Sequence, residues 1–136
     1  MGTIQRILEQ LCGEIANTGA QIRMAYDKTP LAKPPCRYMT GAVTGVQLAS
    51  PSDVSGGALY PMKLQLEFHL LAPPEDTPAM LYDRLEQQLV TPVLESGYTV
   101  MLLRAEEPQI QPRLNKMELT AQVTLLCRYQ RKEETT

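Results

Sequence analysis

The stretch YPMKLQLEFHL, from Tyr60 to Leu70, alternates apolar and polar side chains and decides the fold. Its apolar members are Met62, Leu64, Leu66, Phe68 and Leu70, and its polar members are Lys63, Gln65, Glu67 and His69. A period of two places these sets on opposite faces of a β-strand. Because a strand covered on both faces would not carry a polar residue at every second position, we expect one face to pack on helices. The other face should meet solvent or a partner subunit.

A second alternating stretch runs from Met117 to Tyr129 and predicts another long strand. Its apolar members are Met117, Leu119, Ala121, Val123, Leu125, Cys127 and Tyr129, and they alternate with Glu118, Thr120, Gln122, Thr124, Leu126 and Arg128. Shorter strands are predicted over Gln21–Tyr26, Cys36–Ala49 and Tyr98–Arg104, the last of which should form a hairpin with the C-terminal strand. Gly41 and Gly45 indicate a bulge or bend in the strand that contains them.

Two helices are predicted from apolar spacings of three and four residues. The first should be capped by Thr3 and closed near Gly19, with an apolar stripe of Ile4, Ile7, Leu8, Leu11, Cys12 and Ile15. The second should begin after Thr77, with Pro78 in its first turn, and should be limited by Pro92, with Gly97 ending the segment. Strands punctuated by two helices predict an α+β fold, a largely antiparallel mixed sheet with both helices packed on one face.

Length and composition indicate a single domain. At 136 residues, 43% hydrophobic and 21% charged, the chain is typical of one globular core, which we place over residues 1–130, followed by a charged tail at 131–136. Most of the 11 prolines fall in or beside three predicted loops, Asp27–Pro35, Ser50–Ala58 and Ala105–Lys116.

Charge and hydropathy argue against two classes of partner. A net charge of −2 opposes a general nucleic-acid or anionic-membrane surface, and no apolar run approaches the ~20 residues that cross a bilayer. Cys12, Cys36 and Cys127 form no CxxC pair. We therefore expect all three to be small hydrophobic residues in a reducing compartment.

No catalytic, cofactor-binding or metal-binding constellation is found. His69, the single histidine, could act as a general base, but no orienting partner and nucleophile are evident, so we favour a solvent-facing sheet residue. The pairs Glu75–Asp76 and Glu106–Glu107 lack the ligand spacing of a calcium loop, and no phosphate-binding glycine motif exists. We therefore expect an assembly or binding protein that is not an enzyme.

The order of elements resembles the tail terminator, or tail completion, proteins of long-tailed bacteriophages and related phage-tail-like particles. The resemblance is carried by Lys33–Tyr38 (KPPCRY), the alternating strand, Pro73–Asp76 (PPED), the helix over Met80–Leu89 and a late strand ending near Arg128–Tyr129. It covers almost the whole chain. It implies a subunit without cofactor that forms a ring, usually a hexamer, which stops polymerisation of the tail tube and offers a docking surface to the head or cap. It also implies contact with the sheath in contractile tails, and a place in a virion or tail-like particle assembled in the bacterial cytoplasm.

Contact residues are nominated from the loops and from one strand face. The loop candidates are Lys28, Leu31, Lys33, Arg37, Asp53, Val54, Glu106, Glu107, Ile110 and Arg113. The candidates for the ring interface are Lys63, Gln65, Glu67 and His69, or else the polar face of Glu118, Thr120, Gln122 and Thr124. Each loop could equally be a tolerated surface insertion. Two alternative functions stay open: a head–tail connector completion subunit, and a small enzyme or ligand-binding domain that uses His69.

Overall fold

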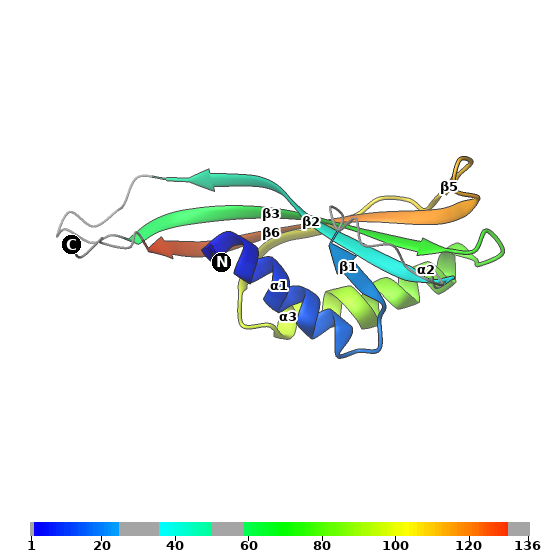
Figure 1. Cartoon of the computed structure of the whole chain (residues 1–136), viewed down its shortest axis with the longest axis horizontal. Coiled ribbons are helices and arrows are strands. Elements are labelled where there is room, and N and C mark those ends of the chain that lie inside the picture. The colour runs from blue at the N-terminus through cyan, green and yellow to red at the C-terminus, as the bar shows by residue number, and fades with distance from the viewer. Residues whose placement is uncertain (1, 25–35, 50–58, 131–136) are drawn as a thin grey trace.

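The computed structural model describes residues 2–24, 36–49 and 59–130. It shows a six-stranded mixed sheet with helices on one side (Figure 1). The elements are α1 (Thr3–Ala16), β1 (Ile22–Met24), β2 (Tyr38–Leu48), β3 (Leu59–Ala72), α2 (Pro78–Arg84), η1 (Leu85–Val90), α3 (Thr91–Glu95), β4 (Thr99–Ala105), β5 (Gln109–Gln111) and β6 (Lys116–Gln130). The strand order is β1-β2-β3-β6-β4, and β5 pairs with β6. Among the described strands, only β1 and β2 pair in parallel. The predicted α+β fold and its largely antiparallel mixed sheet are confirmed.

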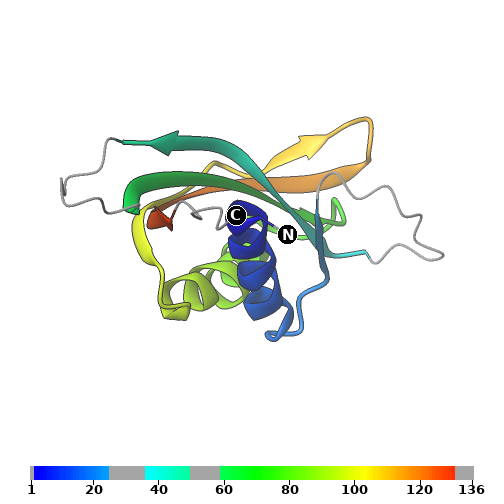
Figure 2. The same cartoon turned by 60° about the vertical axis from the view of Figure 1, so that its left-hand side comes forward.

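The two alternating stretches are neighbours at the centre of this sheet. β3 pairs with β6 over its whole length, so that Leu64 lies opposite Leu125 and Phe68 opposite Ala121. The apolar side chains of both strands point toward α1 and the α2–η1–α3 helix, which lie together on one side of the sheet (Figure 2). The buried side chains form one core cluster, whose largest fully buried member is Phe68. The expected division into a covered face and an open face is therefore confirmed.

The helix boundaries differ from the prediction at two places. Gly2 rather than Thr3 is the N-cap of α1, because the carbonyl of Gly2 accepts the N–H of Arg6 at 3.0 Å and no side chain caps the helix. The second helix does not end at Pro92. A π-turn precedes it, in which the N–H of Thr91 bonds to the carbonyl of Glu86, five residues back. Pro92 then occupies the first turn of α3, where its missing N–H is tolerated.

The other predicted boundaries of that helix are confirmed. The hydroxyl of Thr77 accepts the N–H of Met80 at 3.3 Å, and Pro78 is the first helical residue. Gly97 follows the last turn with a φ of 88°, a left-handed conformation that favours glycine. None of the described helices combines the length and apolar character needed to cross a bilayer.

The segment Ala105–Lys116, expected to be a loop, contains a strand. β5 pairs with Lys116–Glu118 of β6, and the hairpin turns through Asn115 at a φ of 49°. Because β5 has only three residues between Pro108 and Pro112, it shows no periodicity that a sequence could reveal. The other two predicted loops and the tail at 131–136 lie outside the described residues, as do the last two residues of the strand predicted over Gln21–Tyr26.

The cysteines differ from one another in environment. Cys12 is buried in the core, Cys127 is half-buried, and Cys36 is exposed just before β2. The expectation of a small hydrophobic residue is therefore wrong for Cys36, whose predicted strand begins two residues later, at Tyr38. Burial, with a smaller contribution from Glu9, raises the pKa of the Cys12 thiol to about 11.

Candidate interaction surface

The open face of the sheet joins the two polar sets that were predicted as alternative ring interfaces. In the β3–β6 register, Gln65 lies opposite Thr124, Glu67 opposite Gln122 and His69 opposite Thr120. The helices lie on the other side of the sheet (Figures 1 and 2). The two sets therefore form one surface, which we call the polar face and which comprises Lys63, Gln65, Glu67, His69, Glu118, Thr120, Gln122 and Thr124.

His69 is held by its neighbours on the polar face. Its Nδ1 lies 3.0 Å from Oε1 of Glu118 and 3.3 Å from Oγ1 of Thr120, and its Nε2 lies 3.9 Å from Oε1 of Glu67. The hydroxyl of Thr120 also donates to Glu118 at 3.3 Å. The side chain of His69 is 31% exposed on a sheet surface. The arrangement fixes the ring through cross-strand partners, and Glu118 is an orienting carboxylate that was not evident from the sequence.

The β4 edge of the sheet exposes neighbouring apolar side chains. β4 pairs with β6 alone among the described strands, and its register shifts between Val100 and Leu102. The shift breaks the alternation at Met101, so the consecutive side chains of Met101 and Leu102 are 47% and 53% exposed. Leu102 pairs with Thr124 of β6, and Leu126, two residues further along β6, is also exposed. The sequence of β4 contains an unbroken apolar run. Such a run does not indicate which side chains face outward, because that depends on the register of β4 with β6.

The opposite edge of the sheet is also open along part of its length. Within the described residues, β1 covers only Met39–Gly41 of β2. Further along β2, Val46 and Leu48 lie opposite Leu64 and Met62, and Leu48 is 50% exposed. This end of the sheet extends beyond the helices in Figure 1. Exposed apolar side chains thus lie at two edges that are separated by the full width of the sheet.

The predicted loop contacts fall into three groups. Glu106, Glu107, Ile110 and Arg113 are all exposed around β5. Arg37 is engaged in an ion pair and is not a free loop cation. The remaining candidates, Lys28, Leu31, Lys33, Asp53 and Val54, lie outside the described residues.

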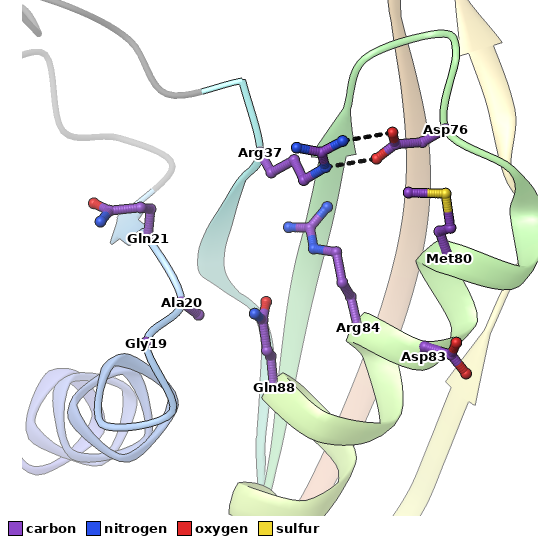
Figure 3. Close-up of a pocket in the computed structure, with 9 residues that line it drawn as sticks. All are labelled: Gly19, Ala20, Gln21, Arg37, Asp76, Met80, Asp83, Arg84 and Gln88. Atoms are coloured by element: carbon purple, nitrogen blue, oxygen red, sulfur yellow. Dashed lines mark hydrogen bonds and ion pairs between the residues drawn. The ribbon is translucent and has the colours of Figure 1, made fainter.

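Arg37 and Asp76 tie the start of β2 to the turn before α2. The guanidinium donates from Nε to Oδ2 at 2.8 Å and from Nη2 to Oδ1 at 2.7 Å, while the aspartate side chain is only 5% exposed. These hydrogen bonds hold the pKa of Asp76 below its ordinary value. The pair lies at the rim of a pocket of about 420 Å³ between Gly19–Gln21, Arg37 and the α2–η1 helix (Figure 3). Sequence reasoning missed this pocket, because its side chains come from four separate segments.

The described residues contain no group of three or more His, Cys, Asp or Glu side chains arranged to hold a metal ion. No protein-family model and no curated protein sequence matches the chain.

Proposed function

We propose that the protein is a structural assembly subunit that forms a closed ring of identical copies, as phage tail terminators do. In this role the ring caps a tail tube, stops its polymerisation and offers a docking surface to the head or cap of a virion or phage-tail-like particle. The subunit is not an enzyme and uses no cofactor. Its partners are further copies of itself, the tail tube protein and, in a contractile tail, the sheath, all brought together in the bacterial cytoplasm.

The observation that carries the proposal is the pair of open sheet edges. A ring needs heterologous contacts, in which two different patches of each subunit meet and the rotation between copies closes. Two such patches lie at opposite edges of the sheet. One is β4 with Met101 and Leu102, and the other is the end of β2 with Val46 and Leu48. Unpaired strand edges with apolar side chains favour pairing with another chain. β5 continues the β4 edge, because both strands pair with the side of β6 opposite β3, so pairing these two edges leaves the polar face available to axial partners.

The polar face supports a protein partner better than a nucleic acid. Lys63 is exposed near the start of β3, whereas Glu67 and Glu118 lie further along the same surface. Charges of both signs on one face match a surface with a complementary pattern, which favours specificity and correct register. A polyanion would instead meet Glu67 and Glu118 as like charges.

The oligomeric state of the full chain tests the proposal. Light scattering coupled to size exclusion should give a mass that is a fixed multiple of 15.2 kDa, and electron microscopy should show closed rings. The variant Leu102→Lys places a charge at the β4 edge and should shift the protein to the monomer. The matched control Leu94→Lys changes a leucine that is also exposed but lies on α3, and it should keep the ring. A wild-type protein that stays monomeric at high concentration would contradict the proposal.

A further inference from the structure

The pocket beside the Arg37–Asp76 pair contains a second arginine, Arg84, which forms no ion pair within the described residues. Arg84 extends from α2 into the pocket, and its Nη1 donates to the carbonyl of Leu71 at 3.1 Å (Figure 3). Both oxygens of Asp76 are taken by Arg37, and Asp83 points away from the Arg84 guanidinium. Within the described residues, no carboxylate forms an ion pair with Arg84. Arg84 is therefore a half-buried cation with donors left to offer.

The electrostatics of the pocket favour an added negative charge near Arg84. Burial, and to a smaller extent the nearby Arg37, lower the pKa of Arg84 because each disfavours its charged form, while the carboxylate of Asp76 opposes them in part. An anion placed beside Arg84 would offset both effects. The guanidinium presents a planar fork that a carboxylate can accept in two parallel hydrogen bonds.

Gln88 adds a hydrogen-bond acceptor to the same pocket. It lies four residues after Arg84, so both side chains leave the same face of the helix, and both enter the pocket in Figure 3. Its Oε1 is buried and has no hydrogen-bond partner among the described residues. A buried acceptor without a partner is costly, and it is most useful where a ligand brings a donor.

We infer that this pocket binds the C-terminal residue of a peptide, or a small N-acylated amino acid of the same chemistry. The ligand carboxylate accepts hydrogen bonds from Arg84, and the amide N–H one carbon away donates to Oε1 of Gln88 once the Gln88 amide group turns from its buried position toward the ligand. Met80 and Ala20 line the pocket and contact the ligand side chain. This inference does not depend on ring formation, because none of these residues belongs to the sheet edges.

The same residues disfavour phosphate. A phosphate dianion would bring a second negative charge toward Asp76 and Asp83, which also line the pocket. It would also meet the acceptor oxygen of Gln88 without offering it an N–H. A carboxylate with an adjacent N–H satisfies both side chains with a single charge.

Binding can be measured with N-acetyl-alanine and the full chain by saturation-transfer NMR, which suits weak ligands and assemblies of any size. N-acetyl-alanine amide lacks the carboxylate, acetate lacks the N–H, and inorganic phosphate tests the other anion class. A tetrapeptide with a free C-terminus distinguishes the two possible ligands, the end of a protein chain and a small N-acylated amino acid. Tighter binding of the tetrapeptide than of N-acetyl-alanine identifies a protein chain end, whereas equal binding identifies a small ligand.

Two variants assign the contacts separately. Arg84→Lys keeps the charge and a donor for Leu71 but loses the planar fork, so it should weaken N-acetyl-alanine about tenfold. Gln88→Met should weaken N-acetyl-alanine but leave acetate unchanged, because acetate has no N–H to lose. Arg104→Lys, at an exposed site on β4, is the matched control and should have no effect. The inference is overturned if the amide binds as well as the acid, if phosphate binds more tightly, or if neither variant changes the affinity.

Discussion

Replacing Gly41 by alanine should destabilise the protein, because the ring of Phe68 occupies the space that a side chain would need. Gly41 lies opposite Phe68 on the covered face of the sheet. A Cβ at this position would come within 2.9 Å of Cε1 and 3.1 Å of Cδ1 of the ring, and within 3.6 Å of Sγ of Cys12. Phe68 is fully buried in the core cluster, so its ring has no solvent to move into.

The magnitude follows from two opposing effects. Overpacking a core costs about 1–3 kcal/mol, while replacing glycine by alanine returns about 0.4–1 kcal/mol through the unfolded chain. The expected net loss is about 1–2 kcal/mol in the free energy of unfolding, or a melting temperature lower by about 5 °C for a chain of this size. Urea unfolding followed by far-ultraviolet circular dichroism measures this loss. Equal protein concentrations are needed, because association changes the apparent stability.

Gly45→Ala is the matched control on the same strand. Its Cβ would come within 2.5 Å of Oε1 of Gln65, which is the far end of an exposed, flexible side chain that can turn into solvent. Neither glycine has a positive φ, so backbone strain does not distinguish them. Gly45→Ala should leave the stability unchanged or slightly raised, and Phe68→Leu should partly rescue Gly41→Ala. If Gly41→Ala were as stable as Gly45→Ala, the account of the core around Phe68 would be refuted.

Three further predictions concern single groups of the structure. Arg37 holds the pKa of Asp76 below the ordinary value of about 3.9. The ionised carboxylate therefore stabilises the fold at any pH above that ordinary value, and this stabilisation is lost as the pH falls through the folded-state pKa. Asp76→Asn should therefore lower the stability at neutral pH and flatten its decline in acid, as measured by urea unfolding across pH. Ellman's reagent should label Cys36 at once in the native protein and Cys12 only on unfolding, because the first thiol is exposed and the second is buried with a raised pKa. Thr77→Ala removes the side-chain cap of α2 and should cost about 1 kcal/mol, whereas Thr77→Ser should not.

The fold was predictable where side-chain periodicity is complete. The alternation in β3 and β6 continues over at least ten residues each, so the buried and open faces could be assigned residue by residue. β5 could not be predicted in this way, because three residues between two prolines contain no pattern. Pro92 was misjudged for a different reason: a π-turn just before it lets the helix continue, and no local sequence rule announces that turn.

The candidate surface was predictable only in part. The polar residues of β3 and β6 could be placed on open strand faces, but their union into one surface depends on the pairing of strands that are separated by more than 40 residues. The exposure of Met101 depends on a register shift, which is a property of two strands together. The Arg84 pocket required knowledge of which carboxylate pairs with which arginine, and that follows from the tertiary fold alone.

Cross-linking between the two sheet edges tests the central claim, a ring of identical copies, most directly. Thr44→Cys on β2 and Met101→Cys on β4 place one thiol at each edge, in a background where Cys36 and Cys127 are serine. A flexible bis-maleimide should join the double-cysteine protein into a ladder of covalent multimers that ends at a fixed size, whereas each single-cysteine protein should remain uncross-linked. Dimers from a single-cysteine protein, or a double-cysteine protein that forms no multimers, would contradict the account.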